Sequence, residues 1–370
     1  MKKRLLAGAG LLAAALAAAL YFFLSPGGSS QQLRLWYVEG DCPAAPLEEL
    51  VRQYNRQRPR GELKLSLQGF SSEDELAAAF EQSRPELLLC SCDRAASLGS
   101  RGQLAELPYS DWGLLPEIED ALPFAGRSFF PLGSAVPVLA CDMAMLDEGG
   151  SFPPGSLEDF LSMAAAWKED NGSAFFSAAE AAPLLAGWSA SLGSQLKGQL
   201  DRDSVDEGFC RVYNLLAQAA YDGCFAPPAG EAGRLLKQGL LPCVFISSTE
   251  AASMGDGWGF SALPLPKEGE RFYVPDIMGL AVFDTGSGSL SSAAAFISWL
   301  GDNYSCLETL SLGLVPVSEN AACSAELPLS RLLMELYQGW KPAVYPPMSS
   351  YMERRAEFEA ELSRALDLLY

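Results

Sequence analysis

The sequence of 370 residues contains no histidine. This absence excludes Ser-His-Asp and Cys-His catalysis and removes the most common metal-binding side chain. A Gly-x-Ser-x-Gly nucleophile elbow and a glycine-rich phosphate loop are also missing. We therefore expect a protein that is not an enzyme and needs no cofactor and no metal. A hydrolase with two carboxylates stays open, because such residues can be far apart in sequence and meet in the fold.

Basic residues are scarce: 26 lysines and arginines face 46 aspartates and glutamates, which gives a net charge of −20. A surface this acidic argues against nucleic acid as a partner, because it would repel the phosphates. Hydrophobic residues make up 49% of the chain and charged residues 19%, values typical of a folded protein. A chain of this length can form two globular lobes, each with its own core.

The amino terminus carries a basic segment at residues 2–4 and then an apolar run at residues 5–24. A basic head and an apolar middle are typical of an export signal, and about 20 apolar residues can also span a bilayer. No small-x-small cleavage site and no cysteine follow Phe23 directly, which favours an uncleaved anchor over a cleaved signal. The positive-inside rule predicts that residues 1–30 leave the rest of the chain outside the cytoplasm.

Nine cysteines are scattered along the chain, and an odd number leaves at least one thiol unpaired in a monomer. Cys90-x-Cys92 has no second cysteine pair or histidine nearby to complete a tetrahedral metal site. Cys141 and Cys243 lie in apolar, strand-like runs, where free cysteine packs as a small hydrophobic residue. We expect structural roles for all nine, and the sequence leaves open whether any disulfide forms.

The first half of the chain alternates between strand and helix patterns. Residues 33–38 are rich in β-formers and predict a strand, and the apolar positions 47, 50, 51 and 54 predict one face of a helix. Two more strand–helix pairs follow, with strands at 63–67 and 87–90. This order predicts a mostly parallel sheet. Small ligands bind where the strands of such a sheet end, so we expect the loop with Glu39 and Asp41 to form one wall of a ligand site.

The second half mixes strands and helices without an internal repeat. Strands are predicted at 136–138, 243–246, 259–265 and 277–283. Helices are predicted at 157–168, 178–200, 207–221, 293–300, 329–337 and 351–369, with a short connector at 313–317.

Several segments, taken in order, resemble one family. They are LRLWYVEG with LEELVRQYNRQRP, PELLLCSCDRAASLGSRGQLAELP, PLGSAVPVLACDMAML with PPGSLEDFLSMAAAW, LLKQGLLPCVFISS, MGLAVF and GLVPVSENA. Together they are similar to the family 1 extracellular solute-binding proteins of ABC importers, which bind sugars and glycerol phosphate. The resemblance covers nearly everything after residue 30.

The resemblance implies an α/β, periplasmic-binding-protein-like fold of type II, with two lobes hinged by three crossing strands and a ligand between them. The implied first lobe comprises residues 31–137 and 270–313, and the second comprises 138–269 and 314–370. The crossings are expected near residues 135–139, 266–273 and 312–318.

The resemblance also implies binding residues in the first lobe. Trp36 and Glu39 match the first binding loop, and Asp93 matches an acidic group after the third strand. Ser134 matches a serine that donates a hydrogen bond to the ligand. Each residue has a structural alternative, because Trp36 can be a core side chain and Asp93 can cap the helix that follows it.

In the second lobe, Trp188 matches an aromatic residue that lines the ligand site, and Ser247 and Ser248 match a serine pair at a strand end. Arg355 matches an arginine that contacts phosphate, although the acidic-acidic-leucine stretch behind it is only partly kept. The serine pair can also cap a helix, and Arg355 can lie on a solvated helix face.

The expected function is that of an extracytoplasmic receptor that binds a carbohydrate or polyol and delivers it to ABC permease subunits. We expect a monomer, tethered to the membrane by its amino terminus or secreted. The family's Gly-Gly pair is replaced here by Asp276-Ile277, which changes the floor of the ligand site. That departure motivates an alternative, a membrane-anchored sensor or interaction protein that keeps the fold without transport.

Overall fold

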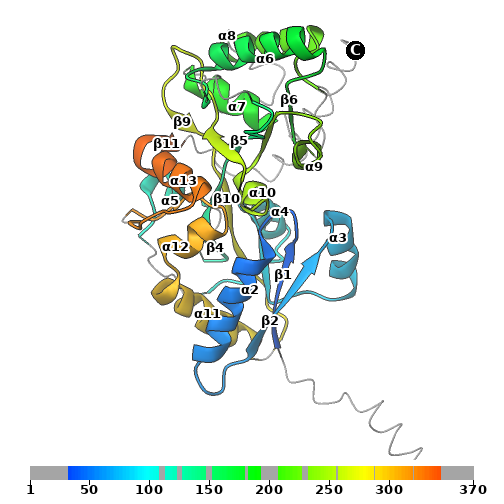
Figure 1. The fold of residues 1–370 in the computed structure, drawn as a ribbon. Helices are drawn as coiled ribbons and strands as arrows, with labels where there is room; N and C mark the ends of the chain where they lie inside the picture. Colours follow the sequence, from blue (N-terminus) through cyan, green and yellow to red (C-terminus); the bar gives the residue numbers. More distant parts are fainter. Residues whose placement is uncertain are drawn as a thin grey trace, which may run out of the picture.

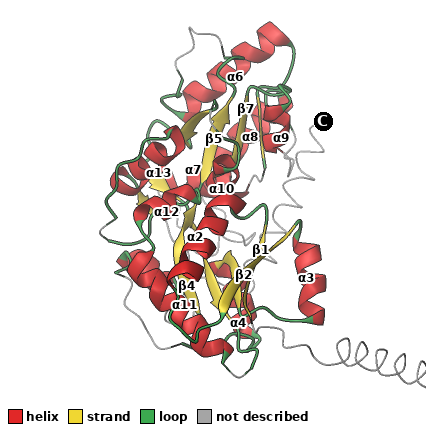
Figure 2. Cartoon of the chain, turned by 60° about the horizontal axis from the view of Figure 1, so that its bottom comes forward, coloured by secondary structure: helices red, strands yellow, loops and turns green. Residues whose placement is uncertain are grey.

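The computed structural model describes residues 32–107, 113–122, 127–146, 152–179, 182–192, 207–226, 232–255, 257–286, 288–319 and 321–342. They form an elongated molecule with two main β-sheets, one toward each end (Figures 1 and 2). This arrangement confirms the predicted two-lobed α/β architecture, while the limits given for the lobes stay a prediction. Among these residues no helix is both long and apolar enough to cross a membrane. The apolar run at residues 5–24 lies outside the described residues.

The first sheet has five strands in the order β2-β1-β3-β10-β4. β1 pairs in parallel with β2 and β3, as the strand–helix alternation predicted. β10 is antiparallel to both of its neighbours, so it is the one reversed strand of this sheet. The strands are β1 (Gln32–Val38), β2 (Lys64–Phe70), β3 (Leu87–Ser91), β4 (Phe129–Ala135) and β10 (Asp276–Val282).

Helices cover both faces of the first sheet. The predicted stripe of α2 is buried, and its Tyr54 packs edge-on against Phe296 and Trp299 of α11. On the other face, Leu76 of α3 joins a core with Trp36 of β1. The helices of this part are α2 (Ala44–Gln57), α3 (Glu73–Gln82), α4 (Cys92–Ser100), α5 (Pro116–Ala121), α11 (Ser289–Asn303) and α12 (Cys306–Ser311).

The second sheet has four strands in the order β6-β7-β5-β8. Phe160, Phe176 and Phe245 pack edge to face in its core, with ring centroids 4.9–5.9 Å apart. Its strands are β5 (Pro137–Cys141), β6 (Phe176–Ala178), β7 (Cys243–Ser247) and β8 (Gly259–Ala262). The helices are α6 (Leu157–Asn171), α7 (Ala182–Ser191), α8 (Glu207–Tyr221), α9 (Ala232–Lys237), α10 (Ser248–Ala252) and α13 (Pro328–Gly339).

The helix predicted over 178–200 is wrong at its start. Residues 176–178 form β6, whose Ser177 pairs in parallel with Val244 of β7. The pairing partner lies far along the chain, so local periodicity carries no trace of it. The helix itself begins at Ala182 and places Pro183 in its first turn, where the missing N–H breaks no helical hydrogen bond.

Within the described part of the chain, three stretches connect the two sheets. β4 ends at Ala135 and β5 begins at Pro137, so the first connection is a single residue, Val136. A second stretch joins β8 to β10 through β9 (Phe272–Tyr273), which pairs with β11 (Lys341–Pro342). The third follows α12, where Val315 exchanges two backbone hydrogen bonds of 2.8 and 2.9 Å with Ser134. The first and third connections therefore lie side by side.

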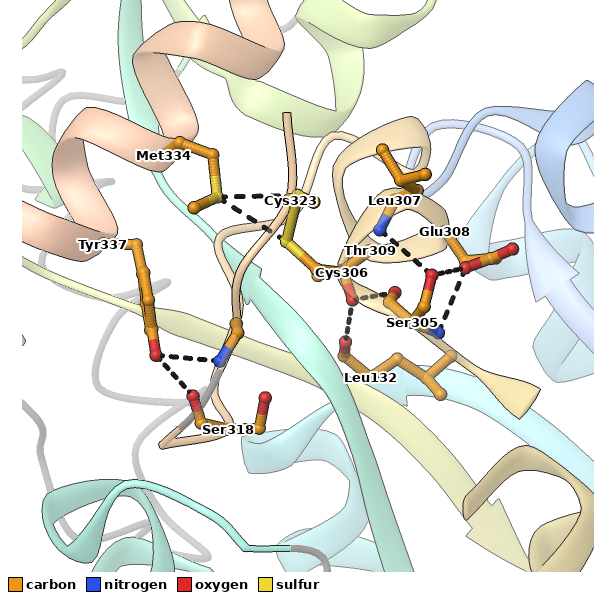
Figure 3. The surroundings of a disulfide bond; sticks show 11 residues. Leu132, Ser305, Cys306, Leu307, Glu308, Thr309, Ser318, Cys323, Met334 and Tyr337 are labelled. Carbon is orange, nitrogen blue, oxygen red and sulfur yellow. Dashed lines mark hydrogen bonds between the residues drawn. A yellow bond between two sulfur atoms is a disulfide. The ribbon is translucent and has the colours of Figure 1, made fainter. Parts of the chain in front are cut away.

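A disulfide encloses the third connection (Figure 3). It joins Cys306, at the start of α12, to Cys323, which precedes α13, and both sulfur atoms contact the thioether of Met334. Within the loop it closes, the Ser318 carbonyl accepts a hydrogen bond of 2.7 Å from the hydroxyl of Tyr337. The connection is thus held covalently at its two ends and by a hydrogen bond in the middle.

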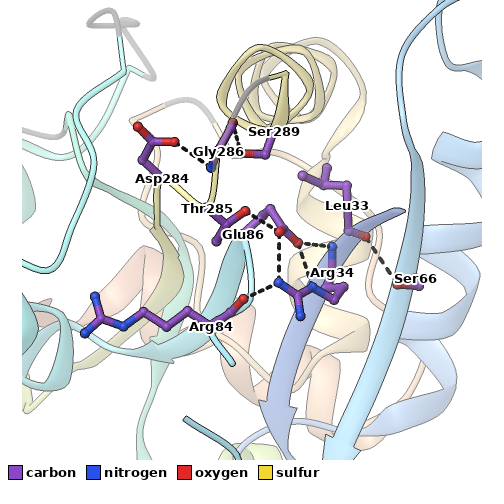
Figure 4. Close-up of polar contacts among 9 residues, drawn as sticks. All are labelled: Leu33, Arg34, Ser66, Arg84, Glu86, Asp284, Thr285, Gly286 and Ser289. Atoms are coloured by element: carbon purple, nitrogen blue, oxygen red, sulfur yellow. Dashed lines mark hydrogen bonds and ion pairs between the residues drawn. The ribbon is translucent and has the colours of Figure 1, made fainter. Parts of the chain in front are cut away.

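The far edge of the first sheet is closed by a buried carboxylate (Figure 4). Glu86, only 5% exposed, accepts hydrogen bonds from the backbone and side chain of Arg34 and from the Thr285 hydroxyl. Burial raises the pKa of Glu86, but these hydrogen bonds outweigh it and hold the pKa below its usual value. The carboxylate at this end is therefore fully satisfied.

A glycine in the third connection generates a testable prediction. Gly313 has a φ of +75°, and a Cβ there would lie 2.5 Å from the Ser248 carbonyl oxygen and 2.8 Å from the Cβ of Ala252. We expect Gly313→Ala to lower the free energy of unfolding by at least about 2 kcal/mol, because the backbone conformation and the clash both act. Denaturant titration measures it.

The matched control is Gly239→Ala. Gly239 has a φ of +66°, and a Cβ added there would have no neighbouring atom within 4 Å, so only the backbone conformation opposes the alanine. Its loss should be about 1 kcal/mol. Equal losses for the two variants would contradict the close approach between the third connection and α10.

Candidate ligand-binding site

In each sheet, the strand ends on one side face the connections. We call this row of strand ends the edge of the sheet. At the first sheet, β3 and β4 end where β10 begins, because Ser91 pairs with Met278 and Ala135 with Asp276. At the second sheet, β7 ends at Ser247, opposite Pro137, the first residue of β5. Since only Val136 separates β4 from β5, these two edges meet at the connections. In open α/β folds this is where ligands bind.

Three aspartates gather at this edge of the first sheet, and we call them the carboxylate edge: Asp41, Asp93 and Asp276. Asp41 lies in the loop after β1, Asp93 in the first turn of α4, and Asp276 opens β10. Burial raises the pKa of Asp276 to about 7, and the charges of Asp93 and Asp41 act in the same direction. Burial also raises the pKa of Asp41 to about 6, with Glu73 adding to the effect. The carboxyl group of Asp276 is therefore repelled by those of Asp93 and Asp41, and that of Asp41 by Glu73.

One cation lies next to the carboxylate edge. Arg94 of α4 lowers the pKa of Asp41 in part, but its guanidinium also pairs with Glu73 at the start of α3. Its backbone N–H donates to the hydroxyl of Ser91, the residue that caps α4. Arg94 therefore ties the starts of α3 and α4 together.

The facing edge of the second sheet carries hydroxyl groups. Ser247 caps α10: its Oγ accepts from the Thr249 N–H at 3.3 Å and lies 2.8 Å from the Thr249 hydroxyl. Ser248 is fully buried, and its backbone N–H and Oγ form hydrogen bonds of 2.8 and 3.0 Å with Val136. Of the predicted serine pair, Ser247 thus caps α10 at the edge, and Ser248 forms hydrogen bonds with the first connection.

The two predicted tryptophans lie in hydrophobic cores. Trp36 is 3% exposed and packs between Phe70 and Phe80. Trp188 is 1% exposed, its ring lies edge-on to Phe245, and its Nε1 donates to the Pro264 carbonyl at 2.9 Å. The structure therefore gives both residues a packing role, and neither ring offers a face to solvent. Their predicted contact with ligand stays without support from the structure.

The remaining predicted residues are distributed as follows. Glu39 is exposed in the loop after β1, and its N–H continues the ladder to Phe70 at 2.9 Å. Asp93 is half-buried at the carboxylate edge. Ser134 is fully buried, and its Oγ has no hydrogen-bond partner among the described residues. Arg355 lies outside the described residues.

Sequence reasoning did not place Asp276 beside Asp41, and it named Asp41 only as part of the loop expected to form one wall of a ligand site. Asp276 stood out solely as a replacement of glycine, because its neighbours Asp41 and Asp93 are more than 180 residues away in sequence. Only the antiparallel pairing of β10 with β3 brings the three together. The usable signal was an acidic residue at the first position of a buried strand, where carboxylates are uncommon.

Comparison with solved structures supports the two-lobed fold. No protein-family model and no curated protein sequence matches the chain. An ABC substrate-binding protein from Listeria monocytogenes, solved with cycloalternan, has a TM-score of 0.72 at 13% identity and covers 92% of this chain and 94% of its own. A cyclic alpha-maltosyl-1,6-maltose binding protein from Arthrobacter globiformis has a TM-score of 0.69 at 15% identity, covering 92% and 95%.

A family 1 extracellular solute-binding protein from Bifidobacterium longum subsp. infantis gives a TM-score of 0.62 at 14% identity, covering 93% of this chain and 96% of its own. At such identities the likeness shows the fold alone. The chain therefore has the two-lobed fold of the family 1 solute-binding proteins, which confirms at the level of fold the resemblance found in the sequence.

The raised pKa of Asp276 predicts a pH dependence of stability. Between about pH 4 and its pKa of about 7, the folded chain keeps a proton that the unfolded chain has lost, so stability falls as pH rises through this window. Asp276→Asn stays neutral and should therefore have a higher Tm than the parent at pH 8 and an equal Tm at pH 4. Thermal unfolding at pH 4, 6 and 8 measures the difference.

The control for this experiment is Asp302→Asn, which changes an exposed aspartate near the end of α11. It should leave the pH profile of the Tm as it is in the parent. A constant Tm difference between Asp276→Asn and the parent at all three pH values would mean that the Asp276 carboxyl does not titrate in this window.

Proposed function

We propose that the protein is an extracytoplasmic solute-binding receptor of an ABC importer that binds a carbohydrate between its two lobes. The observation that carries the proposal is the fold: 92% of the chain is matched by a receptor solved with cycloalternan and by a binding protein for a cyclic maltosyl-maltose. The carboxylate edge also supports the proposal, because it places hydrogen-bond acceptors for sugar hydroxyls where the two sheets meet.

Carboxylates accept hydrogen bonds from sugar hydroxyls, and these bonds are stronger than bonds between neutral groups. Asp41 and Asp276 are poorly solvated, and both are repelled by neighbouring carboxylates. Hydroxyl donors would relieve this repulsion, and closure of the lobes would bring Ser247 toward the same ligand. Such a site holds a polyol and performs no reaction on it.

The contacts assigned to individual residues belong to this proposal. Glu39 and Asp93 bind ligand from the first lobe and Ser247 from the second. Trp36 and Trp188 support these positions from within their cores, Ser134 and Ser248 support the first connection, and Arg355 is retained as a second-lobe contact. The lobes meet at the limits expected from the resemblance, residues 137–138, 269–270 and 313–314.

The cellular setting is proposed from the amino terminus. The basic segment at residues 2–4 and the apolar run at 5–24 direct export and tether the receptor to the outer face of the membrane. There the receptor, as a monomer, passes its ligand to permease subunits. The net charge of −20 suits a neutral polyhydroxylated ligand better than a phosphorylated one.

A ligand screen tests the proposed function. Purified protein lacking residues 1–30 is titrated with linear and cyclic glucose oligosaccharides, xylo-oligosaccharides and polyol phosphates while its Tm is recorded. At 100 times the Kd, a binding sugar should stabilise the fold by about 2.7 kcal/mol and raise the Tm by several degrees. An unchanged Tm across all neutral oligosaccharides would contradict the carbohydrate receptor.

Two variants test whether the carboxylate edge is the site. Asp41→Asn and Asp93→Asn each remove a charged acceptor, so the Kd for the sugar found in the screen should rise by roughly 10-fold or more. Isothermal titration calorimetry measures the Kd, and Asp302→Asn serves as the control with an unchanged value. Parent-like affinity in both edge variants would place the ligand elsewhere.

A further inference from the structure

Two cysteines in the second sheet stand directly opposite each other. In the antiparallel pair of β5 and β7, Cys141 is the partner of Cys243. Just beyond them the Asp142 N–H donates to the Pro242 carbonyl at 2.9 Å, which makes the two cysteines a non-hydrogen-bonded pair. In such pairs the Cα atoms are about 4.5 Å apart and the side chains lean toward each other, within the range that a disulfide spans.

The sulfur atoms already lie in contact. The Sγ atoms of Cys141 and Cys243 are 3.0 Å apart, about 1 Å more than the length of a disulfide bond. The two side chains are 0% and 1% exposed, so each thiol faces the other within a closed core. A small rotation about each Cα–Cβ bond would close the remaining distance without any shift in strand register.

We propose that Cys141 and Cys243 form a second disulfide when the chain folds under oxidising conditions. In this step the two thiols lose two protons and two electrons and a sulfur–sulfur bond forms. The electrons pass by thiol–disulfide exchange to an external disulfide, that of an oxidoreductase or of oxidised glutathione, which is reduced to two thiols. In the cell the step rests on the export part of the proposed function, because disulfides persist in oxidising compartments.

Burial of the two thiols limits the stage of folding at which the disulfide can form. Burial raises the pKa of Cys141 well above its usual value, and the neighbouring Cys243 and Asp142 act in the same direction. Thiolates are the reactive species, so these thiols are poor nucleophiles once the core has closed over them. The bond therefore forms while β5 and β7 pair, before the helices cover them, and afterwards resists reductants.

The position of the bond defines its effect. Cys141 and Cys243 end the strand pair that begins at Pro137 and Ser247, so the cross-link fixes the register of the strands that lead to the ligand edge. It encloses the chain from α6 to α9, which makes up most of the helices of the second sheet. The bond thus holds the second lobe together without touching the carboxylate edge.

The test uses residues 31–370, which contain all the described residues. This protein is reduced, unfolded and then refolded in a mixture of reduced and oxidised glutathione. The product is denatured with N-ethylmaleimide and no reductant, and its intact mass is measured. A Cys306–Cys323 bond alone leaves seven thiols to label. The proposal predicts two fewer, and a peptide containing Cys141 joined to one containing Cys243 after digestion. Seven labelled thiols, or a second bond that joins cysteines other than Cys141 and Cys243, would overturn it.

A buried cysteine of the same core provides the control. Cys224→Ala should lose one labelled thiol and keep the linked peptides, because Cys224 is a free, buried thiol. Cys141→Ala with Cys243→Ala should lose the linked peptides and lower the Tm of the oxidised protein by roughly 5 °C or more relative to Cys224→Ala. Sugar affinity should stay at the parent value. An equal Tm in the two proteins would show that no cross-link stabilises the parent.

Refolding in glutathione separates this proposal from the proposed function, because it needs neither export nor a ligand. Linked peptides in a protein that binds no sugar would support the disulfide and count against the receptor. A sugar-binding protein with seven labelled thiols would do the reverse.

Discussion

Hydrogen bonds between backbone segments at the connections hold the two sheets in place relative to each other. Ser134 and Val315 exchange two hydrogen bonds, and Ser248 forms two with Val136, all at buried positions. These bonds join the end of β4, the start of β5, the stretch after α12 and the first turn of α10. They determine which sheet edges meet, and hence where any ligand between the lobes must lie.

The carboxylates at the two ends of the first sheet have pKa values shifted in opposite directions. At the far end the carboxylate of Glu86 is surrounded by donors from Arg34 and Thr285, and its pKa is lowered. At the end that faces the second sheet, Asp41 and Asp276 are half-buried beside other carboxylates, and their pKa values are raised. Stability alone would favour the first arrangement at both ends. Raised carboxylate pKa values are common at functional sites, and for this reason we propose the ligand site at the facing edge.

The cysteine pairs lie in two different parts of the molecule, one at the connections and one inside a lobe. The Cys306–Cys323 bond encloses the third connection and packs on Met334 of α13, so it restrains the path between the sheets. Cys141 and Cys243 lie inside the second lobe, at the end of the strand pair farthest from the connections. The Cys306–Cys323 bond and the proposed bond between Cys141 and Cys243 both lie away from the carboxylate edge, which is shaped by non-covalent contacts.

Local elements could be predicted from the sequence: the stripe of α2 follows from neighbours a few residues apart, and the alternation of strands and helices indicated the parallel order of β1 to β3. It also indicated the fold through its order of segments. Other features emerge from the three-dimensional fold alone: Trp36 and Trp188 lie in cores, residues 176–178 form a strand, and Asp276 lies near Asp41 and Asp93. Burial and carboxylate repulsion depend on strands paired across more than 180 residues, and no local pattern encodes such contacts.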